Sequence, residues 1–472
     1  MRFYIALISI VFLSIFYSRS YASGEKTVMD KTVHPNIIFF LADDMRWDAM
    51  SCAGNEIIKT PNLDMLANNG IMFRNAFVTT SICAISRASI LTGQYVSKHG
   101  INDFKTSLPD KAFSQTYPML LKKGGYQVGF IGKYGIGKNT NGVAEQFDYF
   151  WGTAHQPVYE NKDRNGNYIH YTDMVDDHIN EFLKTTHPEK PFCLSVSFKS
   201  PHCQGGDSRQ FIYKPEFKDL YANDFIPEQS TNNLEEWNKF PAFFKKNNEA
   251  RKRWEYRFST LPLYQEMVKG YYRLVTGMDE VIGNVWEQLK SKGIEKNTII
   301  IFLSDNGFYL GEHGLAGKWY AHEPSIRVPL IIYNPLRQES AGKVVTQMAL
   351  NIDIAPTILS LAEVDIPESM QGGDLNKIMN GNKKSAWDWR TSFYYEHSIK
   401  QFPTIPPTQA LRNQRYKYII YPETSPVYEE VYDLKKDKAE TQNLVLVRKK
   451  NKLVNKLRAE FKKDQAKVTN EK

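Results

Sequence analysis

The chain has 472 residues, with 60 Lys and Arg against 52 Asp and Glu, a formal net charge of +8 and four Cys. Hydrophobic residues make up 42% and charged residues 24%, which excludes a disordered, fibrous or multi-span membrane protein and is typical of one large globular domain or two. The four Cys are too few for a disulfide scaffold and fit no zinc pattern. Cys193 and Cys203 are expected either to pair or to remain as two buried thiols.

The first 22 residues have the three parts of a secretory signal peptide. Arg2 precedes the apolar run from Ile5 to Phe16, and small residues stand at Ser20 and Ala22. The run is short for a membrane span, and the alternative is an uncleaved N-terminal anchor. We therefore expect cleavage before Ser23, export to the periplasm or the cell exterior, and no stable membrane span.

Basic residues are spread along the sequence with acids between them, except in the tail from Arg448 to Lys452. Such a tail is typical of the solvated face of a final helix. A mildly basic exported chain suits an anionic partner, but this even distribution does not favour nucleic acid.

Short apolar runs alternate with longer amphipathic segments along most of the chain, which predicts an α/β fold. In chain order, the predicted elements are a strand at 36–42, helices at 62–69 and 116–123, a strand at 128–132, a helix at 172–183, a strand at 192–198, a helix at 264–289, strands at 298–304 and 328–333, and a helix at 354–361.

The composition changes twice along the chain. Residues 204–260 are rich in Lys, Asn, Glu and aromatics with little periodicity, which predicts a variable surface insertion. After residue 380, short tyrosine-rich runs precede a charged final segment. We predict a catalytic domain over 23–380 and a smaller α+β subdomain over 381–472.

Carboxylates follow two of the predicted buried strands. Asp43 and Asp44 end the strand at 36–42, and Asp305 and Asn306 end the strand at 298–304. Ligand sites in open α/β sheets lie at the carboxyl ends of strands, and a set of oxygen ligands without His or Cys suits Ca²⁺ or Mg²⁺ rather than zinc. Taken alone, each pair is more often a set of turn or N-cap residues than a metal site.

The segment from Ser81 to Gly93, SICAISRASILTG, places Cys83 and Arg87 four residues apart, on one face of a helix. It resembles the signature C-x-P-S-R, followed by an apolar pair and T-G, of the type I sulfatases in the alkaline phosphatase superfamily. Further family motifs follow in the family's order, from Pro35 nearly to the C-terminus: TPNLD at 60–64, FDYFWG at 147–152, SIRVPL at 325–330 and YDL at 432–434. A chance match to all of them is very rare.

The resemblance implies a large mixed sheet between helices, followed by a smaller subdomain of antiparallel sheet plus a terminal helix. It also implies that a maturation enzyme converts Cys83 to formylglycine, whose hydrated aldehyde attacks sulfur and then expels sulfate by collapsing back to the aldehyde. By the same resemblance, the calcium ligands are Asp43, Asp44, Asp305, Asn306 and the modified Cys83.

The remaining catalytic roles also follow from the resemblance. Arg87 stabilises the nucleophile and the ligands beside it. Lys133 and Lys318 contact sulfate, and His202 is the general acid that protonates the departing sugar oxygen.

Two positions depart from the family pattern. Ile85 stands where the signature has Pro or Ala, which predicts weaker recognition by the maturation enzyme. Gly135 stands where the family has a His that helps to deprotonate the nucleophile. His99, His313 and His322 are possible substitutes by motif order alone, and His322 is also a hypothetical substrate contact.

The expected function is that of an exported, calcium-dependent sulfatase acting on a sulfated carbohydrate, such as a glycosaminoglycan or algal polysaccharide fragment. Small aryl sulfates are further candidate substrates. One rival is a phosphonate or phosphate ester hydrolase of the same superfamily. The other is a catalytically silent protein that binds sulfated glycans, which the residues at positions 85 and 135 motivate.

Overall fold

The computed structural model describes residues 34–337, 339, 341–379, 388–399 and 404–470. From His34 onward the chain folds as one compact unit. The expected signal peptide and the expected domain boundary after residue 380 both lie outside the described residues. None of the described helices is both long and apolar enough to cross a bilayer.

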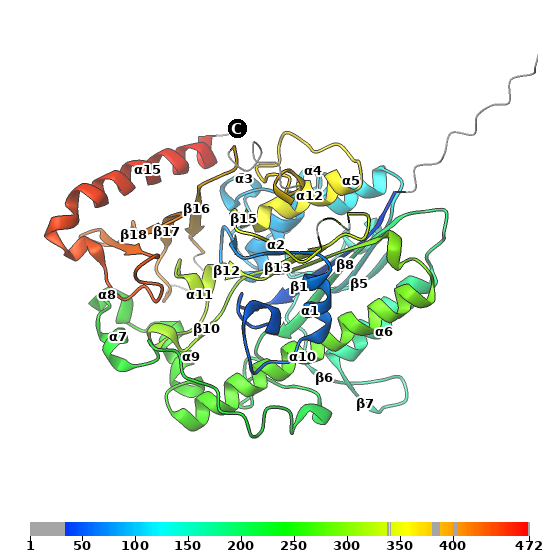
Figure 1. The fold of residues 1–472 in the computed structure, drawn as a ribbon, viewed down its shortest axis with the longest axis horizontal. Helices are drawn as coiled ribbons and strands as arrows, with labels where there is room; N and C mark the ends of the chain where they lie inside the picture. Colours follow the sequence, from blue (N-terminus) through cyan, green and yellow to red (C-terminus); the bar gives the residue numbers. More distant parts are fainter. Residues whose placement is uncertain (1–33, 338, 340, 380–387, 400–403, 471–472) are drawn as a thin grey trace, which may run out of the picture. The chain divides into compact units, whose positions relative to one another are not determined.

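An eight-stranded mixed sheet forms the centre of the molecule (Figure 1). Its strands, in spatial order, are β14 (Lys343–Val345), β2 (Ile71–Phe73), β13 (Leu330–Tyr333), β9 (Thr298–Ser304), β1 (Asn36–Asp43), β8 (Phe192–Pro201), β4 (Gln127–Lys133) and β5 (Tyr149–Thr153). Only β13 runs antiparallel to its neighbours β9 and β2. The central strand β1 is paired in parallel with both β8 and β9, so the carboxyl ends of these three strands meet at one edge.

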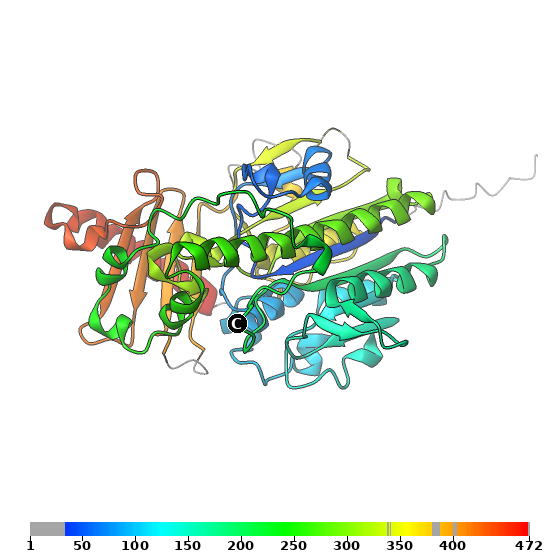
Figure 2. The same cartoon turned by 90° about the horizontal axis from the view of Figure 1, so that it is seen from below.

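Helices cover both faces of this sheet because alternate residues of the buried strands point to opposite sides. Ile37 and Phe39 of β1 join one core, and Ile38 and Phe40 join the other. The first core is covered by α2 (Cys83–Thr92), α5 (Tyr117–Lys123) and α12 (Ile354–Leu361); the second is covered by α1 (Pro61–Asn68), α6 (Tyr171–Lys184) and the long α10 (Leu261–Ser291). Figure 2 shows the long helix α10 lying beside the sheet and running along the direction of the central strands.

A second, antiparallel sheet begins at Ser392. Its strands are consecutive: β16 (Ser392–His397), β17 (Thr408–Asn413), β18 (Tyr416–Tyr421) and β19 (Tyr428–Asp433). Helix α15 (Asn451–Asn470) closes one side, where Phe461 contacts the rings of Tyr394 and Tyr418. The antiparallel sheet and the terminal helix confirm the predicted fold class.

Short elements connect these layers. They are the helices α3 (Val96–His99), α4 (Asp110–Phe113), α11 (Glu323–Ile326) and α13 (Asn376–Met379), and the strands β3 (Ala76–Phe77), β6 (Glu160–Lys162), β7 (Tyr168–His170), β10 (Tyr309–Leu310), β11 (Ala316–Gly317), β12 (Arg327–Val328) and β15 (Ala349–Leu350).

The structure refines three sequence-based expectations: the strand at 328–333, the irregular segment at 204–260, and the pairing of the cysteines. The strand expected at 328–333 is interrupted at Pro329 into β12 and β13, because proline has no backbone N–H for the ladder. Residues 204–260 contain the helices α7 (Leu234–Asn238), α8 (Ala242–Lys245) and α9 (Glu249–Arg257), and they bury Trp237 and Phe244 in the core. All four Cys are free thiols in this structure.

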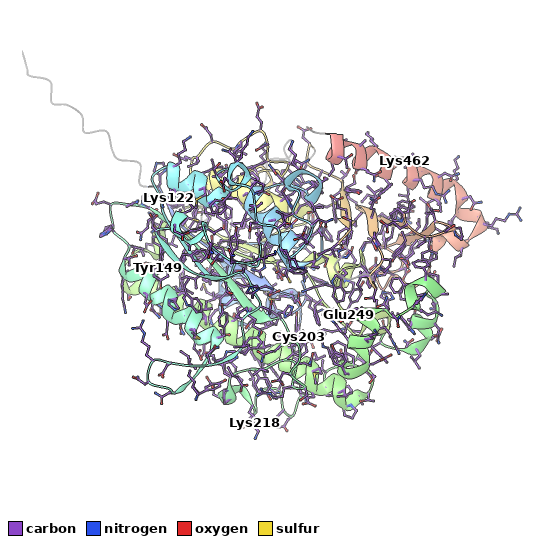
Figure 3. All side chains as sticks on the ribbon, turned by 180° about the vertical axis from the view of Figure 1, so that it is seen from behind. Lys122, Tyr149, Cys203, Lys218, Glu249 and Lys462 are labelled. Atoms are coloured by element: carbon purple, nitrogen blue, oxygen red, sulfur yellow. The ribbon has the colours of Figure 1, made fainter. Side chains whose placement is uncertain are left out.

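The lysines labelled in Figure 3 lie at widely separated places on the outline of the molecule: Lys122, Lys218 and Lys462. Cys203 lies in the interior of the same view. These three lysines therefore do not form one basic patch.

Candidate active site

Three buried carboxylates meet where β1 and β9 end. Ala42 and Ser304 are register partners, so the residues that follow them, Asp43, Asp44 and Asp305, emerge side by side. Asp44 has a positive φ of 67°, and its backbone N–H donates to Asp305 Oδ1 at 3.1 Å. This turn directs the two consecutive carboxylates of β1 into one cluster.

Helix α2 brings the sulfur and a guanidinium to this cluster. Every residue of α2 is buried, and Cys83 and Arg87 lie one turn apart on the face toward the carboxylates. Cys83 Sγ lies 3.2 Å from Asp43 Oδ1. Arg87 Nε donates to Asp305 Oδ2 at 2.9 Å, and a terminal nitrogen donates to the carbonyl oxygen of Lys133 at 2.6 Å.

Two buried lysines complete the cluster from other elements. Lys133, the last residue of β4, pairs with Asp43. Lys318 follows β11, pairs with Asp44, and places its Nζ 3.0 Å from Cys83 Sγ. Both ammonium groups are thus directed at the atoms around the sulfur.

His202 lies at the accessible side of the cluster, directly after the end of β8. Its Nδ1 donates to the carbonyl oxygen of Cys203 at 2.6 Å, and its Nε2 lies 3.5 Å from Asp44 Oδ2. The His202 side chain is 17% exposed, whereas Asp43 and Asp305 are fully enclosed. The exposed residue Gln156 also reaches Asp43, with 3.4 Å between Nε2 and Oδ2. Solvent and ligands therefore approach the cluster from this side.

Burial and the neighbouring charges shift the pKa values of these groups. Burial opposes ionisation of Asp43, but Lys133, His202 and Arg87 hold its pKa well below the usual range. Burial and the charge of Asp43 raise the pKa of Asp305 to about 6 and that of the Cys83 thiol to about 12. The unmodified thiol is therefore protonated at neutral pH, and the carboxylates repel one another.

The donor atoms fit a hard divalent cation. Asp43, Asp44, Cys83 and His202 offer ligand atoms that all lie within 4.8 Å of one another. The amide oxygen of Asn306 is buried, without a hydrogen-bond partner among the described residues, while its amide nitrogen donates to Asp44 Oδ1 at 2.6 Å. Three carboxylates and an amide oxygen are ligands that Ca²⁺ and Mg²⁺ prefer. A cation among them would also relieve the repulsion that raises the pKa of Asp305.

The other sequence-predicted histidines lie away from the sulfur. His322 is fully buried, and its ring nitrogens bond Tyr309 at 2.7 Å and Glu430 at 3.3 Å. His99 bonds Ser89, and burial lowers its pKa to about 3. His313 packs against the ring of His322. In this structure the described contacts of all three histidines are therefore with residues outside the cluster around Cys83.

Gly135 has a φ of +74°, and a Cβ at this position would lie 3.1 Å from Arg87 Cδ. A side chain here would therefore press on Arg87 and adopt a strained backbone conformation. The nearby hydroxyl of Ser197 instead accepts a hydrogen bond from Arg87 and donates to the carbonyl oxygen of Lys133 at 2.7 Å.

Sequence analysis did not identify the side chains that contact Cys203, the residue after His202. Arg257 of α9 is buried and donates to Cys203 Sγ at 3.0 Å and to Gln210 at 2.6 Å. Burial opposes ionisation of the Cys203 thiol, but Arg257 and His202 lower its pKa to about 6. The only sequence signal was that Cys203 adjoins His202, because α9 lies within the segment that showed little periodicity.

Comparisons with known proteins agree with this geometry. A sulfatase family model matches residues 35–364, and a model described as N-sulphoglucosamine sulphohydrolase, C-terminal, matches 311–467. The chain is 30% identical to an N-acetylglucosamine-6-O-sulfatase of Bacteroides thetaiotaomicron, over 90% of this chain and 85% of that one. It is 28% identical to an ulvan-active sulfatase of Formosa agariphila, over 93% and 84% of the two chains.

A solved structure described in complex with its substrate D-glucosamine-2-N,6-O-disulfate superimposes with a TM-score of 0.77. It is 26% identical to this chain and covers 93% of it, while 99% of that chain is covered.

The mixed sheet between helices, with a carboxylate cluster and a helix-borne cysteine at its carboxyl edge, matches the alkaline phosphatase class of ester hydrolases. Within that class, the chain belongs to the sulfatase family, and it is a sulfuric ester hydrolase.

Proposed function

We propose that this chain is an exported, calcium-dependent sulfatase that hydrolyses a sulfate ester of a sugar with a formylglycine nucleophile made from Cys83. The observation that carries the proposal is the position of Cys83 Sγ, 3.2 Å from Asp43 Oδ1 and 3.0 Å from Lys318 Nζ, at the centre of the charged cluster. The named relatives act on glucosamine sulfate and ulvan, which supports a sulfated glycan as the substrate class.

The chain's own residues provide for an oxygen nucleophile at position 83. Because the pKa of the thiol is raised to about 12, the unmodified side chain is a poor nucleophile. Formylglycine at this position supplies a hydrated aldehyde, whose oxygen can attack sulfur. Asp43 and Lys318, which contact Sγ, are placed to hold that oxygen and to move its proton.

The charge balance favours an anionic ester. Arg87, Lys133 and Lys318 face three carboxylates, so the protein groups alone are balanced. Calcium held by Asp43, Asp44, Asp305 and Asn306 would supply Lewis-acid stabilisation of negative charge. With a divalent cation bound, the site has an excess of two positive charges. Lys133 and Lys318 then lie where they can bind the oxygens of a sulfate group.

A direct test compares the hydrolysis of matched sulfate and phosphonate esters by protein from its native host. We expect release of inorganic sulfate from glucosamine 6-sulfate, and loss of that activity after EDTA treatment with recovery on addition of Ca²⁺. The melting temperature should fall with EDTA too, since the cation stabilises the folded state and relieves carboxylate repulsion.

The matched control is a phosphonate monoester assayed under the same conditions. Faster hydrolysis of the phosphonate than of any sulfate ester would assign the site to the rival chemistry. Binding of the sulfated sugar without release of sulfate, by a protein shown to carry formylglycine, would favour the silent binding protein.

The role of His202 predicts a dependence on the leaving group. His202 → Ala should lower kcat for a sugar sulfate by about 10²-fold or more, because an alkoxide leaves poorly without a proton. Hydrolysis of 4-nitrophenyl sulfate should change far less, since nitrophenolate leaves without help. Equal losses on both substrates would show that His202 acts in binding or positioning and not as the general acid.

The matched control variant is His155 → Ala. His155 is exposed and lies next to Gln156, at the same side of the cluster. This variant should leave the ratio of the two rates unchanged.

A further inference from the structure

A second charged cleft of about 470 Å³ lies between the main sheet and the antiparallel sheet. It is lined by the loop that follows β1, by residues around α11, and by the segment after β19. None of the residues of the candidate catalytic cluster lines it. Its volume is within the range of small-molecule sites and is sufficient for a sugar unit.

Each of the four carboxylates of this cleft pairs with a cationic side chain of the protein. Asp48 and Glu312 pair with Arg46. Glu323 pairs with Arg412, and with Lys417 at 3.0 Å. Lys417 also pairs with Glu440 at 2.7 Å. The acidic side of the cleft therefore offers little attraction to a further cation.

Three cationic side chains of the same cleft have no such partner. Arg74, Arg327 and Lys438 line the cleft and make no ion pair with a carboxylate in the described part of the chain. Arg74 and Lys438 are exposed, whereas Arg327 is half-buried. Burial of Arg327 lowers its pKa, and the charges of Arg412 and Arg74 lower it further, although Glu323 and Asp48 oppose the shift. An anion placed among these side chains would relieve that repulsion.

The guanidinium of Arg327 is held in position within the cleft by its contacts. Its guanidinium stacks on the Trp47 ring at 3.9 Å, and its Nε donates to the carbonyl oxygen of Arg74 at 3.1 Å. The stacking holds the planar group in place, so little conformational entropy remains to be lost when an anion binds. Arg327 belongs to the SIRVPL motif, for which the catalytic cluster provides no role.

We propose that this cleft is a second, non-catalytic site that binds a sugar unit bearing a sulfate or carboxylate, with the anion held by Arg74, Arg327 and Lys438. Only the choice of a sugar rests on the proposed function; the charge and shape of the cleft do not. Such a site would let the protein hold one unit of an anionic glycan away from the unit being hydrolysed.

The test counts binding sites by calorimetry at low salt, in full-length Cys83 → Ala protein so that no turnover occurs. The probe is glucosamine 2-N,6-O-disulfate. We expect two sites per chain, and one after the double substitution Arg74 → Glu and Lys438 → Glu. Both residues are exposed, so folding should persist, and circular dichroism and a thermal melt check this. Lys462 → Glu, on the exposed side of α15, is the charge-matched control and should retain two sites.

The outcomes separate this inference from the proposed function. A single binding site that disappears in the double variant would support the proposed site in the cleft. The same result would count against binding of this probe at Cys83. Any number of sites that the double substitution leaves unchanged would overturn the inference. Neutral N-acetylglucosamine should not bind the cleft, and equal binding of it would overturn the electrostatic basis. Glucuronate, which carries a carboxylate in place of a sulfate, is the second probe. Binding of glucuronate in the cleft would show that the site accepts either sugar anion. No binding of glucuronate would assign the site to sulfated sugars.

Discussion

Replacing Cys83 with alanine is expected to lower the rate of sulfate release by about 10³-fold or more while the protein stays folded. The side chain lies between Asp43 and Lys318, and no other nucleophilic side chain among the described residues is held by both. Alanine leaves the surrounding ion pairs in place, so binding of the sulfated sugar should survive. The measurement is the initial rate of sulfate release together with a binding isotherm.

Cys52 → Ala is the matched control, because Cys52 is a free, half-buried thiol outside the cluster. It should keep the wild-type rate. The mass of the tryptic peptide containing Cys83, taken from the native host, provides an independent check. Formylglycine, as the aldehyde or its hydrate, is the expected species, and it would show that Ile85 is tolerated. Unmodified cysteine together with full activity would contradict the proposed nucleophile.

Substitution of Arg87 by methionine is expected to have the largest effect on stability. Arg87 pairs with Asp305 at 2.8 Å and lies 3.6 Å from Asp43, with both carboxylates fully enclosed. Removing one partner of a buried pair leaves an uncompensated charge, which costs about 3–5 kcal/mol. We expect a loss of this size in the free energy of unfolding, measured by urea denaturation in EDTA so that no cation replaces the guanidinium.

Arg458 → Met is the comparison. Arg458 pairs with Glu429, but its side chain is 42% exposed, so solvent screens the pair and the loss should be far smaller. Equal losses in the two variants would show that the carboxylates near Arg87 are neutralised by protonation or by Lys133, and that the guanidinium is not what stabilises them.

Much of the site could be predicted because its parts follow buried strands. The apolar runs before Asp43 and Asp305 are long enough to identify β1 and β9, and parallel neighbours bring their carboxyl ends together. Cys83 and Arg87 were found by helical spacing and by motif. Lys133, Lys318 and His202 were not distinguishable from surface residues without the family resemblance, since a single polar residue after a strand has no periodicity.

Other features are set by contacts that the local sequence does not encode. Strand β17 was missed because Thr408–Asn413 alternates too weakly to show a buried face, and it becomes ordered by pairing with both β16 and β18. The aromatic residues of 204–260 gave no helical period, yet Trp237 and Phe244 pack into the core. The second cleft combines residues from Arg46 to Glu440, which only the fold brings together.

The pairing of β1 with β9 has a consequence for when Cys83 can be reached. Asn36 pairs with Thr298, at the start of β9. The central strand β1 therefore cannot form all of its hydrogen bonds with β9 until residue 304 has been synthesised. At about 5–20 residues per second, roughly 10–40 s separate synthesis of Cys83 from that point. Afterwards Cys83 is 3% exposed in a helix with every residue buried. An enzyme that modifies Cys83, as we propose, would therefore compete with folding itself, and a variant that folds faster would then carry less of the modified residue.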